Sequence, residues 1–364
     1  MGVIVHQRKI LLALAAFILV LAPVQGWGET TLKSTSAPLR SPWSAAKSAP
    51  GKVKYNCPKP APLPRDIVAT QYYNDAKKSV IDPVAYAAYN AVEAIFDEQM
   101  GAVASAADAY RRSGNPAAVD CAVQLLKTAA TSDAMTGSMS ANQAYYLQNW
   151  TLGSLATSYL KVQPSGLVSA QDNATITAWM LKVGWQVESY FEPHRQKKTM
   201  DGRNNHIYWA GFAAMAAAIA GNDHKLFDWG ASTYADGVDA IQPDGTLPLE
   251  MDRGQRALHY HLFAVTPLVM MAEFGEDNGL PMYAANNGAL HLLARRCLTG
   301  LANNSYFAAK TGIKQDTPEG GKIQSLDVYW AVPYVKRFPN ASISALVNSV
   351  QITPGHFLGG LPPQ

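Results

Sequence analysis

The sequence predicts an all-α fold built from helical hairpins, and three observations support this prediction. Long segments carry apolar residues at the spacing that places them on one face of a helix. Short polar connections join these segments, and no runs rich in valine and isoleucine alternate with them. No strict internal repeat is present, which favours a closed or nearly closed ring of hairpins over a regular solenoid.

The individual helices follow from the same spacing, in order along the chain. Tyr89, Val92 and Phe96 mark the apolar face of the first. Asp223 is a plausible N-cap for the sixth, and Gly221 with Asn222 stops the helix before it. The segments that we expect to be helical are 83–101, 117–130, 143–160, 173–191, 206–220, 223–241, 253–274 and 288–301.

The N-terminal residues 1–26 have the pattern of a secretory signal peptide. Arg8 and Lys9 precede an apolar run over 10–22, and residues 24–26 offer a small-residue cleavage site. This run is too short to span a bilayer, which needs about 20 residues. We therefore expect a periplasmic or secreted protein without a membrane segment in its mature form; an uncleaved anchor is the alternative.

The rest of the chain divides by composition into three parts. Residues 27–54 are rich in Ser, Pro, Ala and Lys, which predicts a flexible leader. Residues 55–358 carry the helical pattern and form the predicted domain. Residues 359–364 are rich in Gly and Pro and predict a disordered tail.

Three cysteines follow the export signal, and this odd number suggests one disulfide and one spare thiol. Cys57 lies just before the helical region and Cys121 lies inside a helical pattern, so we expect these two to pair. Cys297 stands among leucines and is expected to be a core thiol. Without a CxxC motif, no structural zinc site is expected.

The formal net charge is only +3, so composition alone does not indicate a polyanion-binding protein. The distribution of charge is more informative. A basic loop is expected at 194–198 with Arg203 nearby, and Arg253 and Arg256 share a second segment. Such clusters are usually solvated faces, but both of these adjoin segments whose residues could take part in catalysis.

The first candidate catalytic segment, 203–211, places two amides and an imidazole at the start of an Ala-rich helix. One asparagine, Asn204 or Asn205, suffices to cap the helix, which leaves the other for a different role. Asn205 and Trp209 are four residues apart and share a face beside His206. A histidine satisfied by the core is the structural alternative.

The second segment, 249–261, combines cations with a phenol. If it is helical, Arg253, Arg256 and Tyr260 fall on one stripe. The positive charges are expected to favour phenolate and so to lower the pKa of Tyr260. The alternative is a solvated basic face with Tyr260 as packing. His259 and the second histidine of HYH point different ways in a helix, so no metal pair is expected.

Together these residue types suit β-elimination in a polyuronate. Removal of the C5 proton requires the adjacent carboxylate to be neutralised, and Asn205, His206 and Arg253 are suited to that task. Tyr260 then serves as general base toward H5 and as general acid toward O4. One residue serves both steps only when H5 and O4 lie on the same side of the ring. This holds for β-D-mannuronate and β-D-glucuronate and fails for guluronate.

Several motifs resemble polysaccharide lyase family 5, the mannuronate-type alginate lyases, over roughly residues 55 to 340. The matching blocks are NNHIYW at 204–209, FDWG at 227–230, DG at 244–245, EMDR at 250–253 and LHY at 258–260. The resemblance implies an incomplete (α/α) toroid with a lid loop over the cleft and no required metal or other cofactor. It also implies a Cys57–Cys121 disulfide.

The resemblance also implies roles for individual residues. Asn205 and Arg253 correspond to the carboxylate-neutralising pair, His206 to the catalytic histidine and Tyr260 to the acid–base. Trp150 resembles a tryptophan that stacks on a sugar ring. The side chains that we expect to contact substrate are Gln71, Tyr72, Trp150, Arg203, Trp209, Arg256 and His259.

One departure from the family pattern lies in the lid segment. The family often carries Lys-Tyr or Arg-Tyr there, whereas this chain has Gln71 before Tyr72. Lys77 and Lys78 follow closely and could supply the missing charge. The neutral glutamine extends the expected substrates from mannuronate to glucuronate-containing polymers.

The sequence thus predicts an endo-type polyuronate lyase that leaves 4,5-unsaturated ends, acts as a monomer and binds anionic polysaccharide rather than nucleic acid. A glycoside hydrolase needs two opposed carboxylates, and Glu250 and Asp252 are two residues apart on a helix and do not face each other. A non-catalytic periplasmic polyanion-binding protein is the remaining alternative, and it would not need Tyr260 beside His206.

Overall fold

The computed structural model describes residues 32–47, 54–318, 322–353 and 355–363. By its internal contacts the chain divides into two units, Met1–Thr31 and Leu32–Gln364. The first unit, and with it the predicted signal peptide, lies outside the described residues. Within the described ranges of the second unit the regular elements are helices and the only β-pairings are isolated bridges, which confirms the all-α prediction.

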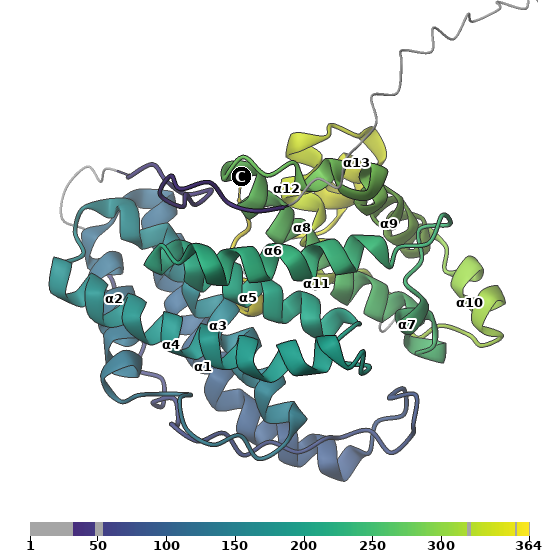
Figure 1. Cartoon of the computed structure of the whole chain (residues 1–364), viewed down its shortest axis with the longest axis horizontal. Coiled ribbons are helices and arrows are strands. Elements are labelled where there is room, and N and C mark those ends of the chain that lie inside the picture. The colour runs from purple at the N-terminus through teal and green to yellow at the C-terminus, as the bar shows by residue number, and fades with distance from the viewer. Residues whose placement is uncertain (1–31, 48–53, 319–321, 354, 364) are drawn as a thin grey trace, which may run out of the picture. The chain divides into compact units, whose positions relative to one another are not determined.

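Within its described residues, the second unit contains eight long helices (Figure 1). They are α1 (Pro83–Ser113), α2 (Pro116–Thr131), α3 (Asn142–Val162), α4 (Ala170–Gln196), α5 (Asn205–Gly221), α6 (His224–Asp239), α8 (Ala257–Asp277) and α9 (Ala285–Ala302). The shorter elements are α7 (Pro248–Met251), α10 (Ser305–Thr311), α11 (Ser325–Val328), α12 (Ala331–Arg337), α13 (Ala341–Ser349), and the 3₁₀ turns η1 (Gln163–Ser165), η2 (Gly254–Arg256), η3 (Met282–Ala284) and η5 (His356–Leu358).

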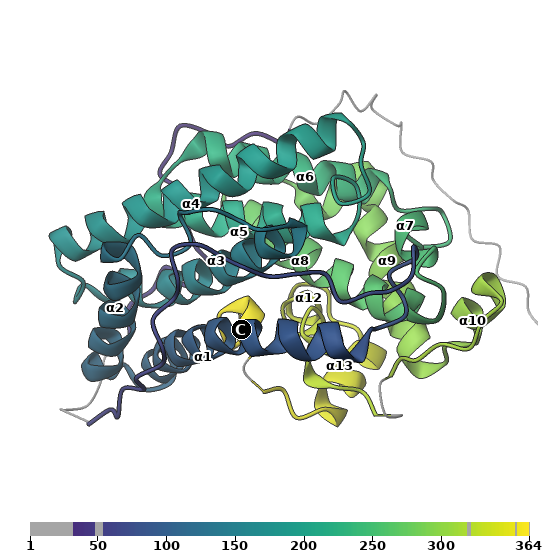
Figure 2. The ribbon, with the colours of Figure 1, turned by 90° about the horizontal axis from the view of Figure 1, so that it is seen from below.

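Consecutive helices pack as hairpins, α1 with α2, α3 with α4, α5 with α6 and α8 with α9. The first helices of these hairpins also pack on one another, α1 on α3, α3 on α5 and α5 on α8, and form an inner row. Nearly every residue of α5 is buried, as expected for a helix that is apolar on all sides. In Figures 1 and 2, α4, α5 and α6 run close together.

Side-chain caps start the helices where the sequence places polar residues. The Asn204 Oδ1 accepts the backbone N–H of His206 at 3.0 Å, so Asn204 is the residue that caps α5. Asp223 caps α6, and Asn222 ends α5 in the left-handed conformation at φ 56°, as predicted. Because Asn204 provides the cap, Asn205 is left for another role.

The predicted helix over 253–274 begins later than expected. Arg253 precedes the 3₁₀ turn η2, and α8 starts only at Ala257. Gly254 has φ of +59°, a conformation that favours glycine, and it changes the direction of the chain at this point. Arg253 and Tyr260 therefore do not share one continuous helical stripe.

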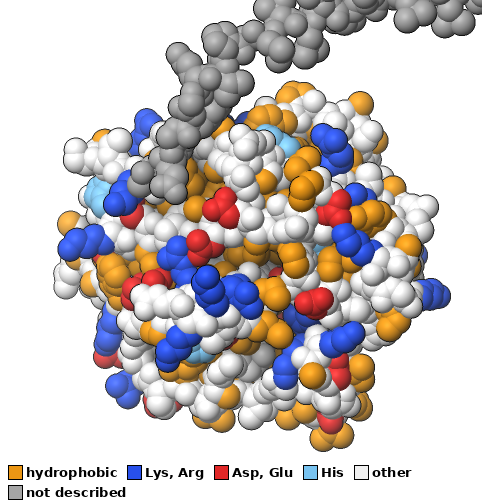
Figure 3. All heavy atoms as spheres, turned by 45° about the vertical axis from the view of Figure 1, so that its right-hand side comes forward, with side chains coloured by type: hydrophobic (Ala, Val, Ile, Leu, Met, Phe, Trp, Pro, Cys, Tyr) orange, Lys and Arg blue, Asp and Glu red, His pale blue; other side chains and the backbone are white. Residues whose placement is uncertain are grey.

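The basic stretch that was expected to be a loop is partly helical. His194 and Arg195 belong to the last turn of α4, which ends at Gln196. Arg195 pairs with Asp236 and lies 3.3 Å from Glu192. The charge of Arg195 is thereby neutralised. On the face shown in Figure 3, Lys and Arg side chains lie in small groups separated by apolar and acidic ones.

The flexible leader predicted over 27–54 is wrong for its described part, residues 32–47. Leu32 and Trp43 are buried in the core. The backbone N–H of Ser34 donates to Asp228 on α6 at 2.7 Å. The prediction was wrong because composition indicates only local backbone flexibility. The order of this segment comes from contacts with residues far along the chain, such as Asp228.

The disordered tail predicted over 359–364 is wrong for residues 359–363. The buried Lys161 Nζ donates to the Gly359 carbonyl at 2.6 Å and pairs with Asp108 at 2.6 Å. The backbone N–H of Leu361 donates to the same Asp108 carboxylate at 2.8 Å. This segment therefore packs against α1 and α3, beside the C-terminal label in Figure 2.

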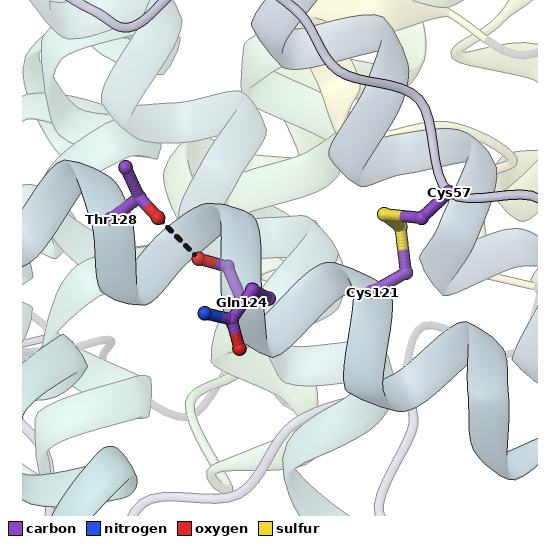
Figure 4. Close-up of a disulfide and its surroundings, with 4 residues drawn as sticks. All are labelled: Cys57, Cys121, Gln124 and Thr128. Atoms are coloured by element: carbon purple, nitrogen blue, oxygen red, sulfur yellow. Dashed lines mark hydrogen bonds between the residues drawn. A yellow bond between two sulfur atoms is a disulfide. The ribbon is translucent and has the colours of Figure 1, made fainter.

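The Cys57–Cys121 disulfide is present, with a Cα–Cα distance of 5.5 Å (Figure 4). It ties the extended segment before α1 to α2 across a sequence separation of 64. Cys297 is a buried free thiol, as predicted, and burial raises its pKa. In the part of the chain that the structure describes, no helix has the length and hydropathy to cross a bilayer.

Removal of this disulfide is expected to lower the free energy of unfolding by about 4 kcal/mol, because the unfolded chain regains the entropy of an open loop. Urea unfolding of the Cys57→Ser/Cys121→Ser variant measures the loss. Reductant should destabilise the wild type to the same level and leave the double variant unchanged. A wild type indifferent to reductant would contradict the prediction.

Candidate active site

The site lies at the N-terminal ends of α5 and α8, and Tyr73 and Lys78 of the segment 66–82 contact its side chains. The backbone N–H of Asn205 donates to Glu250 Oε1 at 2.7 Å, and its Nδ2 lies 3.0 Å from both carboxylate oxygens. Both residues are buried. Burial raises the pKa of Glu250, while Arg253 and the Asn205 donors oppose that rise. Glu250 thus fixes the orientation of the Asn205 amide.

His206 follows on the first turn of α5. Its ring stacks on Tyr146 of α3, with centroids 3.8 Å apart and planes at 16°. Burial, and then the charge of Arg253, lowers the pKa of His206 to about 3. The imidazole is therefore neutral near pH 7. Its buried Nδ1 has no hydrogen-bond partner among the described residues.

Arg253 and Tyr260 meet even though they do not share a helix. The guanidinium carbon of Arg253 lies 3.4 Å from the centroid of the Tyr260 ring, and that of Arg256 lies 5.4 Å from it. Burial nevertheless raises the pKa of Tyr260, with the two arginines opposing. The expected lowering is wrong because desolvation of the phenol outweighs the nearby positive charge.

The segment 66–82 closes over these side chains and contributes a residue that the sequence analysis missed. The hydroxyl of Tyr73 lies 2.6 Å from the hydroxyl of Tyr260 and accepts a hydrogen bond from Arg256 at 2.8 Å. The Nη2 of Arg253 donates to the Lys78 carbonyl at 2.6 Å. The only sequence signal for Tyr73 was its place beside Tyr72.

The lid residues that were predicted to bind substrate lie farther from the phenol. Tyr72 packs against Tyr86 and Tyr89, with ring centroids 5.0 and 4.8 Å away. Gln71 is exposed, and its amide donates to the carbonyl of Tyr73 within the same loop. Neither makes a hydrogen bond to the catalytic candidates in this conformation.

The two tryptophans differ in position. Trp209 is fully buried, and its indole N–H donates to the Phe263 carbonyl at 3.0 Å. Its predicted contact with substrate is therefore wrong, because its face of α5 packs into the core. Trp150 lies 6.3 Å from the His206 ring and is covered edge-on by Phe263 and Phe357, with 7% of its surface exposed.

The other predicted contacts flank the site. His259 lies 3.1 Å from Arg256 through its Nε2, and burial followed by the arginine charge lowers its pKa to about 3. Both residues line a cavity of about 210 Å³ together with Ser79 and Asp316. Arg203 is exposed before α5. No group of three His, Cys, Asp or Glu among the described residues is arranged to hold a metal.

The Arg253 guanidinium lies against the buried Tyr260 phenol, and its charge also acts on the neutral His206 imidazole and on Glu250, which holds the Asn205 amide. Such groups stabilise an anion and move a proton, which are the two requirements of acid–base chemistry at a carboxylate-bearing carbon. A sequence model described as alginate lyase matches residues 66–307. The chain belongs to the alginate lyase family. It is thus a member of a family of polysaccharide lyases.

Similar proteins support the assignment of this chain to the alginate lyase family. A polysaccharide lyase of Stenotrophomonas maltophilia is 39% identical over 262 residues, covering 71% of this chain and 77% of the relative. An alginate lyase of Pseudomonas syringae pv. syringae is 38% identical over 229 residues, which is 62% of this chain. The chain spans about three fifths of that relative, 59% of its length.

Solved structures of the alginate lyase family show the fold. Alginate lyase A1-III complexed with a tetrasaccharide superposes with a TM-score of 0.75 at 22% identity, over 85% of this chain and 86% of the other. Alginate lyase A1-III from Sphingomonas species A1 gives 0.71 over the same shares at 22% identity. The inner and outer helices of this chain therefore form the predicted (α/α) toroid.

Proposed function

We propose that this chain is an endo-acting lyase that depolymerises polyuronates, poly-β-D-mannuronate and glucuronate-containing polymers among them, by syn β-elimination. The observation that carries the proposal is the buried Tyr260 phenol with the Arg253 guanidinium 3.4 Å from its ring. The neutral His206 and the oriented Asn205 amide lie at the start of the adjacent helix. The alginate lyase relatives support the substrate class.

The first step is neutralisation of the substrate carboxylate. Asn205, His206 and Arg253 offer two neutral polar groups and one cation, which stabilise the enolate-like charge that develops as H5 leaves. The Arg253 guanidinium now donates to the Lys78 carbonyl. A bound carboxylate would take over this hydrogen bond.

The second step is proton transfer through Tyr260. The phenolate oxygen takes H5, the C5–H electrons form the C4=C5 double bond, and the C4–O4 bond breaks. The same phenol then gives its proton to the departing O4. Since Tyr73 holds the Tyr260 hydroxyl at 2.6 Å, substrate must displace the Tyr73 hydroxyl before this step.

Initial rates on separate polymannuronate, polyguluronate and polyglucuronate test the proposal. We expect ultraviolet absorbance of the 4,5-unsaturated product from the first and third and little from polyguluronate. A rapid fall in viscosity at low conversion identifies endo action. Reducing ends without absorbance would indicate hydrolysis, and absence of cleavage on all three would refute the proposal.

The rate is expected to rise continuously with pH from about 5.5 to 9, without a separate step near pH 6.5. Burial raises the pKa of Tyr260, so the fraction of phenolate grows throughout this range. Because the pKa of His206 is lowered to about 3, its imidazole stays neutral over the whole range. A pH profile of kcat/KM checks this. A limb near pH 6.5 would point to a histidine of ordinary pKa as the base.

Replacement of Glu250 by glutamine is expected to lower kcat/KM by about 100-fold, because Asn205 loses its orientation and small misplacements cost rates of this order. A glutamine keeps one acceptor oxygen and puts an NH2 group where Oε2 accepts from the Asn205 Nδ2, so two NH2 groups would face each other. Asp252→Asn is the matched control, since Asp252 is an exposed carboxylate two residues away. Equal losses in the two variants would contradict the role of Glu250.

The proposal includes export to the periplasm or the medium and a monomeric enzyme. Cell fractionation with N-terminal sequencing tests the predicted removal of residues 1–26. Light scattering of the purified protein tests the oligomeric state. Recovery of the uncleaved protein in membranes would overturn the export prediction and leave the chemistry unaffected.

A further inference from the structure

A second cavity lies apart from the catalytic candidates. Its volume is about 440 Å³, and its walls come from residues 137–139, the first turns of α3 and the end of α4. Tyr145, Gln148, Tyr190 and Lys197 are among the residues that line it. None of the four side chains assigned to elimination belongs to it.

The cavity and the elimination site share a support. The hydroxyls of Tyr146 and Tyr190 both donate to Asp201 Oδ2 at 3.1 Å. Tyr146 stacks on His206, while Tyr190 lines the cavity. One carboxylate thus joins the wall of the cavity to the ring that supports the catalytic histidine. The cavity wall and the catalytic histidine are therefore connected through only two tyrosines and one aspartate.

The wall carries an aromatic pair. Tyr145 and Tyr190 stack with centroids 3.8 Å apart and planes at 10°. Tyr145 is half-buried and lines the cavity. Tyrosine combines an apolar ring with a polar hydroxyl, a combination suited to a sugar ring that has C–H faces and hydroxyl edges.

The rim carries a cation without a protein counter-ion. Within the basic cluster, His194 pairs with Asp201 and Arg195 with Asp236. Lys197 lines the cavity and is exposed, and no carboxylate lies within ion-pair distance of it in the described ranges. An ammonium at the mouth of an aromatic-walled cavity favours a carboxylate-bearing ligand.

The wall also holds an unsatisfied acceptor. Gln148 is 1% exposed, and its Nε2 donates to the Met135 carbonyl at 2.8 Å and to Gln186 at 3.2 Å. Its Oε1 is buried and has no partner among the described atoms. Buried polar atoms are rarely left without a hydrogen bond, so this oxygen points to a polar ligand group at the wall.

We infer that this cavity is an accessory subsite for a uronate residue of the same polymer, one or more sugars away from the bond that breaks at Tyr260. The sugar ring lies against Tyr145, and its carboxylate pairs with Lys197. The inference rests on the proposed function and adds a dependence on chain length: long substrates fill the cavity and short ones do not.

The test compares Lys197→Ala with Lys198→Ala, whose exposed lysine is the next residue and does not line the cavity. Loss of one charge-assisted contact should raise KM for the polymer by about three- to tenfold. The kcat and the KM for the shortest cleavable oligomers should stay the same. Tyr145→Leu keeps an apolar side chain but removes the ring and its hydroxyl, and it should act in the same way, with thermal unfolding as the check on folding.

Binding in the Tyr260→Phe background separates the two proposals. Calorimetry with long and short saturated oligouronates should show weaker binding of the long ones when Lys197→Ala is added, and no change when Lys198→Ala is added. Equal binding by both variants overturns the subsite, even if the enzyme cleaves polyuronates. Absence of unsaturated product from any polymer overturns the lyase proposal, while the binding result still decides the subsite.

Discussion

Replacement of Tyr260 by phenylalanine is expected to lower kcat by about 10³- to 10⁴-fold and to leave polymer binding largely intact. The variant keeps the ring that packs beneath the Arg253 guanidinium, at 3.4 Å in the wild type, and removes only the oxygen that carries the proton. Positioned acid–base groups contribute rates of up to this size, and here one group serves both transfers. Single-turnover absorbance and calorimetric binding measure the two quantities.

Tyr73→Phe is the matched control, because the Tyr73 hydroxyl lies 2.6 Å from that of Tyr260. It should change the rate far less, since the Tyr73 hydroxyl leaves that of Tyr260 when substrate binds and takes no proton from the sugar. If Tyr260→Phe retained more than a few per cent of the wild-type rate while Tyr73→Phe abolished it, the two tyrosines would have to exchange roles.

Replacement of Lys161 by methionine is expected to lower the free energy of unfolding by about 3–5 kcal/mol. Its ammonium is 1% exposed, pairs with Asp108 and donates to the Gly359 carbonyl. Burial lowers the pKa of Lys161, and Asp108 opposes this. Removal of the ammonium leaves a buried carboxylate without its counter-ion and a carbonyl without its donor. Urea unfolding measures the loss.

Lys182→Met provides the comparison for this prediction. Lys182 pairs with Asp133 at 2.8 Å on the surface, where the two side chains are 51% and 58% exposed. Water and salt screen such pairs, so the unfolding midpoint should barely move. Equal losses in the two lysine variants would show that residues 359–363 are not held by the buried pair.

The helices could be predicted from the sequence because their signals are local. Apolar spacing located the long helices, and short polar side chains such as Asp223 marked their ends. Residues 32–47 and 359–363 could not be placed in this way. Their order comes from partners far along the chain, such as Asp228 for the Ser34 N–H, and composition carries no information on those partners.

The candidate site was predictable where residue types occur in unusual neighbourhoods. Two amides beside His206 and two arginines near Tyr260 stood out in this way. Glu250 was considered only as a hydrolase carboxylate, since its contact with Asn205 spans 45 residues. The pKa direction of Tyr260 was missed because the charges are visible in a sequence and the burial that outweighs them is not.

The contact between Lys161 and Gly359 also sets an order of events during synthesis. The two residues are 198 positions apart, so at usual elongation rates the lysine is synthesised roughly 10 to 40 s before the carbonyl that accepts its hydrogen bond. During that interval the α1–α3 region lacks its closing segment. The buried pair of Lys161 and Asp108 can therefore be covered only when the whole chain is available.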